Sequence, residues 1–181
     1  MNSQDELGRI FRRPDDRAPS GLLAWSIRVL GEWPEYALRL RSVIGSALSI
    51  AEQQSFEQDE IDVGILPQWF LQVTEGDINS ASLPIVCRLG RQRYLDLIED
   101  RPWTIREWIY NFDPDLRHWK WWDLTVDQDD RLILWLDSSG EPTFAADELR
   151  WAVFCAGAAE VTSLGLLSSS IWSEQPSLGT D

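Results

Sequence analysis

Residues 117–137, RHWKWWDLTVDQDDRLILWLD, form two runs of alternating side chains separated by a cluster of aspartates. Alternation with a period of two is typical of a β-strand that buries one face. Aspartate favours turns because its side chain hydrogen-bonds to nearby backbone. The pattern therefore predicts an antiparallel hairpin with strands at 118–126 and 131–137.

The two faces of this hairpin differ in composition. A loop with an odd number of residues between the two strands pairs Leu124 with Leu132. This register puts the leucines on one face, which we expect to lie in the core. That core face includes Trp122, Leu124 and Val126. The opposite face carries three rings and a carboxylate: Trp119, Trp121, Trp135 and Asp123. Two interpretations of this second face stay open, namely cross-strand packing under a helix and an exposed binding surface.

Helical periodicity marks several other segments. Helices are predicted at 21–30, 34–53, 66–76, 91–99, 104–113 and 147–157. Thr104 and Glu107 have the spacing of a capping box. Short strands are expected at 85–89 and 160–169.

These elements predict an α+β fold. We expect a single domain over 21–172, in which several helices pack on a small antiparallel sheet containing the 118–137 hairpin. A chain of 181 residues is long enough for such a core, since it buries about 70% of its unfolded surface. Residues 1–20 mix four arginines with four acids and are expected to be a mobile arm. Residues 173–181 are expected to be a loose tail.

Nothing in the sequence indicates export or membrane insertion. The N-terminus lacks the apolar core of a signal peptide, and no stretch approaches the ~20 apolar residues of a membrane span. Cys87 and Cys155 are the only cysteines and lack metal-binding spacing. We therefore expect a soluble cytoplasmic protein without disulfides.

The charge is strongly negative and unevenly distributed. Thirty acids against sixteen bases give a net charge of −14. Residues 42–87 carry seven acids and no base, and residues 99–148 carry thirteen acids against five bases. Such a field repels nucleic acid and anionic membranes and attracts basic partners. A second interpretation is that the charge serves solubility alone.

Motifs of catalysis are missing from the sequence. His118 is the only histidine, which excludes a site with two histidine ligands. The phosphate-binding, dinucleotide-binding, zinc-protease and serine-hydrolase signatures are absent as well. The DQDD turn lacks the glycine and terminal glutamate of a calcium loop. The sequence therefore predicts a non-enzymatic domain without cofactor or metal.

Three classes of binding function fit these features. Tryptophan platforms beside carboxylates suit a carbohydrate-binding or glycoside-hydrolysing domain. An acidic surface with aromatic anchors suits an adaptor, or an inhibitor of a basic protein. In its charge, size and lack of catalytic motifs, the chain resembles the small acidic immunity proteins with which bacteria neutralise toxins, many of them basic nucleases.

The resemblance implies a protein partner, a basic toxin domain. The residues predicted to contact it are Glu57, Asp59, Glu60, Asp62, Trp119, Trp121, Asp123, Asp127, Asp129, Asp130 and Trp135.

Overall fold

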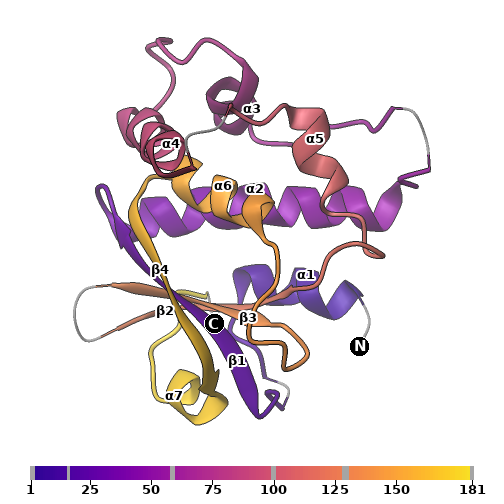
Figure 1. The fold of residues 1–181 in the computed structure, drawn as a ribbon, viewed down its shortest axis with the longest axis vertical. Helices are drawn as coiled ribbons and strands as arrows, with labels where there is room; N and C mark the ends of the chain where they lie inside the picture. The colour runs from indigo at the N-terminus through magenta and orange to yellow at the C-terminus, as the bar shows by residue number, and fades with distance from the viewer. Residues whose placement is uncertain (1–2, 16, 58–59, 99–100, 128–130, 180–181) are drawn as a thin grey trace. The chain divides into compact units, whose positions relative to one another are not determined.

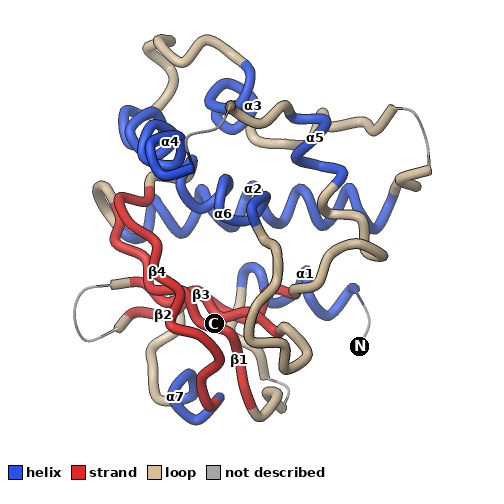
Figure 2. Tube along the Cα trace, in the orientation of Figure 1, coloured by secondary structure: helices blue, strands red, loops and turns tan. Residues whose placement is uncertain are grey.

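The computed structural model describes residues 3–15, 17–57, 60–98, 101–127 and 131–179. Within these residues, seven helices and four strands follow one another along the chain (Figure 1), which confirms the predicted α+β class. The predicted single domain divides into two compact units. Strands gather in one unit, and most helices belong to the other (Figure 2). Among the described helices, none has the length and apolar character needed to cross a membrane.

The sheet unit comprises Met1–Val29, His118–Ala146 and Glu160–Asp181. Its strands are β1 (Gly21–Val29), β2 (Lys120–Val126), β3 (Leu132–Asp137) and β4, which starts at Ala158 and ends at Ser168. They form one sheet in the order β2-β3-β1-β4. The hairpin and the final strand are thus confirmed. Two helices complete the unit, α1 (Ser3–Phe11) and α7 (Ser169–Ser173).

The helical unit comprises Leu30–Arg117 and Asp147–Ala159. It contains α2 (Trp33–Gln53), α3 (Gln68–Glu75), α4 (Ile85–Ile98), α5 (Ile105–Tyr110) and α6 (Asp147–Cys155). The Tyr36 hydroxyl of α2 donates to the carbonyl of Val153 in α6 over 3.1 Å, so these two helices pack directly (Figure 1). The predicted helices over 34–53, 66–76 and 147–157 are confirmed.

The predicted helix at 21–30 is wrong, because these residues form β1. This strand pairs on both sides within the sheet, and Leu22–Ile27 are buried on both of its faces. A strand buried on both faces has a continuous apolar sequence, which periodicity alone does not distinguish from a buried helix. Gly31 follows with a φ of 104°, a left-handed conformation that glycine adopts readily.

The predicted strand at 85–89 is also wrong, because α4 runs without a break from Ile85 to Ile98. Gly90 lies in the middle of this helix, where the sequence suggested a boundary. A Cβ atom there would approach the carbonyl oxygen of Phe154 in α6 to 1.9 Å. Glycine therefore serves close packing of α4 on α6 and does not interrupt the helix.

A β-bulge in the hairpin exchanges the faces of two tryptophans. Leu124 lies opposite Leu134, two residues from the predicted pairing, and the register shifts between Trp121 and Asp123. The inserted residue turns Trp121 to the side of Leu136. Trp122 instead joins the cluster on the other face, which consists of Leu22, Ala24, Ile133, Trp135 and Trp172.

The predicted mobile arm contains α1, which packs beside β2 (Figure 1). The backbone N–H of Trp121 donates to the buried carboxylate of Glu6 over 2.6 Å, and the guanidinium of Arg9 lies 4.4 Å from the centroid of the Trp122 ring. Burial of Glu6, Arg9 and Ile10 accounts for the order of this segment. The expectation of an unstructured arm is wrong for residues 3–11.

The predicted loose tail follows the outer edge of β2. The N–H of Val126 donates to the carbonyl of Pro176 over 3.0 Å, and the N–H of Leu178 donates to the carbonyl of Leu124 over 2.9 Å. Ser177 forms a β-bridge with Thr125. The C-terminal segment 174–179 therefore covers one edge of the sheet, which would otherwise be open to pairing with other chains.

Side chains hold this segment in place as well. Asp123 is fully buried, and its carboxyl group accepts from the indole N–H of Trp172 over 2.8 Å and from the hydroxyl of Ser177 over 2.7 Å. Thr125 accepts from the indole of Trp135 over 2.7 Å and bonds to Gln175. Two buried indole N–H groups, those of Trp172 and Trp135, thus find their acceptors in side chains of β2.

Replacing Asp123 tests this network. Asp123→Ala leaves the N–H of Trp172 without its acceptor, and we expect urea unfolding to show a loss of about 3 kcal/mol, since hydrogen bonds to charged groups are worth about 1.5–3 kcal/mol each. Asp123→Asn keeps one acceptor oxygen and should lose less. Exposed Glu141 is the control, because Glu141→Gln should stay within about 0.5 kcal/mol of the original. Equal stability of the alanine variant and this control would contradict the assignment.

Candidate functional site

The tryptophans of the hairpin are core residues. Trp119, Trp121 and Trp135 are at most 1% exposed. Of the eleven tryptophans, eight are buried. The structure therefore favours the packing interpretation of this face, and these rings offer no surface to a partner. The carbohydrate alternative loses the ring platform on which it was based.

The acidic residues of the prediction fall into three groups. Glu57, Glu60 and Asp62 are exposed on the loop between α2 and α3. Asp123 is buried, and Asp127 is half-buried at the hairpin turn, where its N–H donates to the carbonyl of Arg131 over 2.8 Å. The remaining predicted acids, Asp59, Asp129 and Asp130, lie outside the described residues.

A reciprocal pair of hydrogen bonds shapes the acidic loop. The side-chain amide of Gln54 donates to the carbonyl of Asp62 over 2.8 Å, and the N–H of Asp62 donates back to the Gln54 side-chain oxygen over 2.8 Å. The Asp62 carboxylate accepts from the N–H of Gly64 over 2.8 Å. These bonds join the two ends of the loop, and Glu57 and Glu60 are exposed on it.

The loop borders a cavity of about 300 Å³ against α5. Apolar groups and carboxylates both line it: Glu60, Ile61, Val63, Glu75, Ile105, Arg106, Ile109 and Tyr110. Phe56 of the loop packs edge-on against the Tyr110 ring, with 5.8 Å between centroids. Glu75 also accepts from the N–H of Ile105 over 2.9 Å, which fixes α3 to the start of α5. One loop carboxylate, that of Glu60, thus lies at the wall of a half-apolar hollow.

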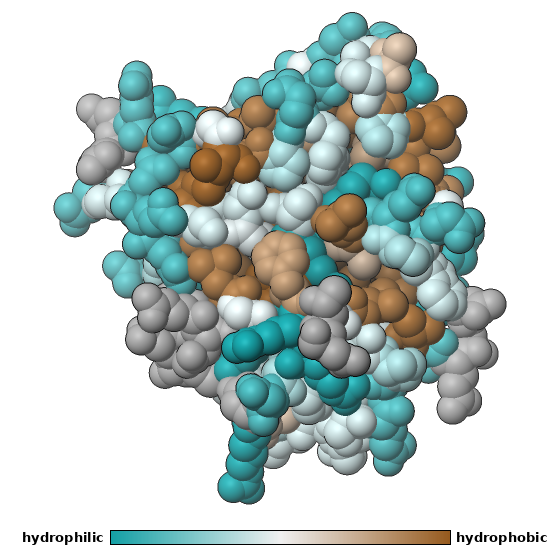
Figure 3. Space-filling model, turned by 180° about the vertical axis from the view of Figure 1, so that it is seen from behind, coloured by the Kyte–Doolittle hydropathy of each residue, from teal (hydrophilic) through white to brown (hydrophobic). Residues whose placement is uncertain are grey.

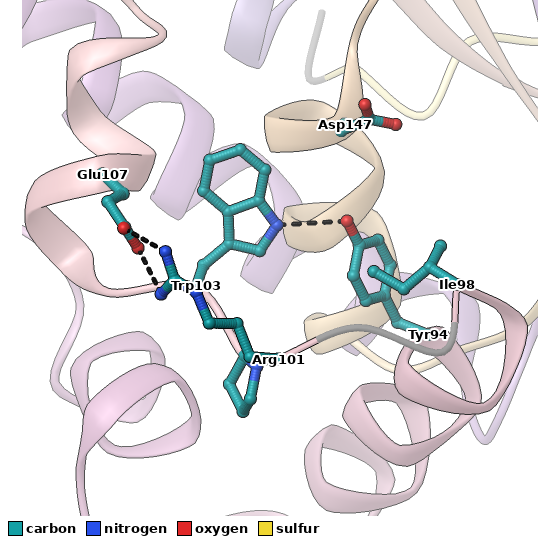
Figure 4. Close-up of a pocket in the computed structure, with 7 residues that line it drawn as sticks. Tyr94, Ile98, Arg101, Trp103, Glu107 and Asp147 are labelled. Carbon is teal, nitrogen blue, oxygen red and sulfur yellow. Dashed lines mark hydrogen bonds and ion pairs between the residues drawn. The ribbon is translucent and has the colours of Figure 1, made fainter.

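A second cavity, of about 420 Å³, lies at the other side of α5. Figure 4 shows the indole N–H of Trp103 pointing to the Tyr94 hydroxyl, at 3.1 Å, and Arg101 paired with Glu107. The capping box is confirmed, because Thr104 accepts from the N–H of Glu107 and the Glu107 carboxylate accepts from the N–H of Thr104. Arg101 and these Thr104 contacts hold the pKa of Glu107 at about 2.

The residues around α5 are those that sequence reasoning missed. Arg101, Trp103, Arg106 and Tyr110 belong to the residue types that dominate binding energy in protein interfaces. The signal was present in RPWTIREWIY, which is dense in arginine and aromatic residues. The same residues also fit a capped helix with an apolar stripe. That interpretation accounts for the tryptophans without a binding role.

Polar and charged side chains accompany apolar ones in the linings of both hollows. On the face drawn in Figure 3, apolar side chains lie in separate groups between hydrophilic ones. Within the described residues, no group of three or more histidine, cysteine, aspartate or glutamate side chains is placed to hold a metal ion. We define the candidate surface as residues 54–57 and 60–64 with α5 and its two cavities. It offers a ligand linings that combine carboxylates and aromatic rings.

Comparison of the chain with protein-family models, with curated proteins and with solved structures returned no match.

The burial of Trp121 makes a quantitative prediction. Trp121→Ala should destabilise the protein by about 3–5 kcal/mol, the usual cost of emptying a large aromatic site. Trp103→Ala is the matched control, because Trp103 is only half-buried at its cavity and should cost less. Chemical denaturation measures both. If the Trp121 variant is as stable as the original protein, the assignment of this ring to the core is wrong.

The Arg101–Glu107 pair makes a prediction about pH. Folding lowers the pKa of Glu107 from 4.5 to about 2. These contacts therefore stabilise the folded protein above about pH 4.5, and their contribution disappears as the pH falls through about 2. NMR titration of the Glu107 carboxyl should show this pKa, and Arg101→Gln should raise it toward 4.5. A pKa near 4.5 in both proteins would contradict the pairing.

Proposed function

We propose that this protein is an acidic protein-binding domain that inhibits a basic partner, in the manner of an immunity protein against a bacterial toxin. The observation that carries the proposal is the acidic loop held at the rim of the cavity against α5. Glu57, Glu60 and Asp62 are exposed on this loop, and Glu60 lines the cavity. A net charge of −14 extends their field to distances at which a basic partner is first attracted.

The cavity beside the loop suits the side chain of a lysine or arginine. Its aliphatic stem would lie against Ile61 and Ile109, and its cation would meet the carboxylates of Glu60 and Glu75. Basic side chains combine an apolar stem with a charged head, so they fit a hollow that is half apolar. A nuclease toxin exposes such residues because its substrate is anionic.

The aromatic residues around α5 provide the desolvated centre of such an interface. Trp103 and Tyr110 lie on the two sides of the helix, each at the wall of a cavity. Rigid rings lose little conformational entropy on binding, whereas charged rims contribute mainly to the rate of encounter. In this proposal, the loop carboxylates speed association, and the rings of Trp103 and Tyr110 slow dissociation.

The proposal places the protein in the cytoplasm, where an imported toxin would meet its inhibitor. Both cysteines are free and buried, as suits a reducing compartment. A generic adaptor would share the same surface, and the two are separated by rescue. An inhibitor restores the growth of cells that express the toxin, whereas an adaptor does not.

Association kinetics test the proposed interface, with the product of the gene adjacent to this one as the probe. Association should slow steeply as salt increases, because the Debye length falls from about 10 Å at 0.1 M to about 3 Å at 1 M. The double change Glu57→Gln with Glu60→Gln should lower the association rate about tenfold at low salt and leave dissociation nearly unchanged.

A matched control removes the same charge elsewhere. Glu141 and Glu174 are exposed in the sheet unit, and Glu141→Gln with Glu174→Gln should leave association within about twofold of the original. Trp103→Ala should instead accelerate dissociation. If both double variants slow association equally, the net negative charge of the whole protein attracts the partner and the acidic loop has no special role. If salt has no effect on association, the acidic-inhibitor mechanism is wrong.

A further inference from the structure

The two edge strands of the sheet, β2 and β4, differ in whether another described segment of the chain pairs with them. At β2, the C-terminal segment 174–179 supplies hydrogen bonds to the outer edge. At β4, the other terminal strand in the sheet order, no described residue is paired beyond it. Residues 162–164 of β4 are exposed, and residues 165–168 alternate between half-buried and exposed. An open edge strand presents unpaired N–H and C=O groups in a row.

The exposed part of β4 is apolar and accessible. Leu164 and Leu166 are 44% and 40% exposed, and Ile171 of the following helix is 43% exposed. Gly165 has a φ of 77°, and a Cβ atom there would meet nothing within 4 Å, so this position is open to solvent. A hollow of about 470 Å³ adjoins the end of the strand at Leu166 and Ser168.

This edge is also the longest uncharged part of the sequence. Residues 161–173, VTSLGLLSSSIWS, contain no acidic or basic side chain. Natural proteins usually protect an open edge with charges, lysine above all, or with proline. Glu160 at the start of the strand is paired with Arg28 at 3.2 Å and with Arg131 at 3.6 Å. An incoming strand would therefore meet no charge along the exposed edge.

Charge indicates which partner fits this edge. A basic protein is attracted electrostatically to an acidic surface, and a neutral strand offers it no such attraction. A second copy carries the same charge of −14 and is repelled wherever acids face acids. The neutral edge is the contact at which two copies avoid that repulsion. Antiparallel pairing of β4 with itself is also self-complementary, as a twofold interface requires.

We propose that two copies of this protein dimerise by antiparallel pairing of their β4 strands, which forms one continuous sheet across the two molecules. Leu164 and Leu166 of each copy lie at this junction. The dimer is independent of the inhibitor function, since its surface belongs to the sheet unit and the acidic loop to the helical unit.

Sedimentation equilibrium over a dilution series tests the dimer with the full chain alone. We expect a reversible monomer–dimer equilibrium that shifts toward dimer as salt increases, because salt screens the repulsion between like-charged copies. This dependence is opposite to that expected for binding of a basic partner. Leu164→Glu puts a negative charge on the edge and should weaken the dimer at least about tenfold.

Leu38→Glu is the matched control, since Leu38 is 65% exposed on α2 and should leave dimerisation unchanged. Hydrogen exchange of the original protein gives a second readout, in which the amides of 161–168 should slow at high protein concentration. A protein that stays monomeric throughout, an open-ended assembly, or equal dimerisation of the two variants would overturn the proposal.

Discussion

The carboxyl group of Asp123 is buried inside the sheet unit, where its hydrogen bonds join parts of the chain 49 and 54 residues apart. A buried carboxyl group costs several kcal/mol unless donors surround it, so the donors of Trp172 and Ser177 must be in place for β2 to keep its position. Once they are, the C-terminal segment lies along β2 and covers that edge. The protection of one edge, and by contrast the openness of β4, follow from this arrangement.

Capping has a comparable role in the helical unit. The helix α5 has only six residues and would be marginal alone. Thr104 and Glu107 satisfy its first N–H groups, Glu75 of α3 supplies a further acceptor, and the indole of Trp108 donates to the carbonyl of Glu148 over 2.8 Å. These bonds hold the short helix between two cavities, so that both hollows have a rigid common wall.

The two proposed interfaces use opposite properties of one surface charge. In these proposals, the acidic loop would attract a basic partner at long range, and the uncharged edge of β4 would permit approach by an identical copy. Because salt weakens attraction and repulsion alike, it should lower one affinity and raise the other.

Sequence alone determined the elements that are specified locally. The amphipathic period of 34–53, the capping box at Thr104 and the two strands of the hairpin each depend on neighbouring residues, and the structure confirms all three. The acidic loop was also visible in the sequence, because runs of acids without apolar residues are rarely buried.

Tertiary structure decided whatever depends on distant neighbours. Residues 21–29 form a strand because they are enclosed by partners on both sides, and α4 passes through Gly90 because α6 approaches closely there. The bulge before Asp123 exchanged the predicted faces of Trp121 and Trp122, which no periodic pattern foresees, since one inserted residue reverses the alternation. Packing between segments far apart in the chain buries the hairpin tryptophans. The candidate site is therefore at α5 and not at the hairpin.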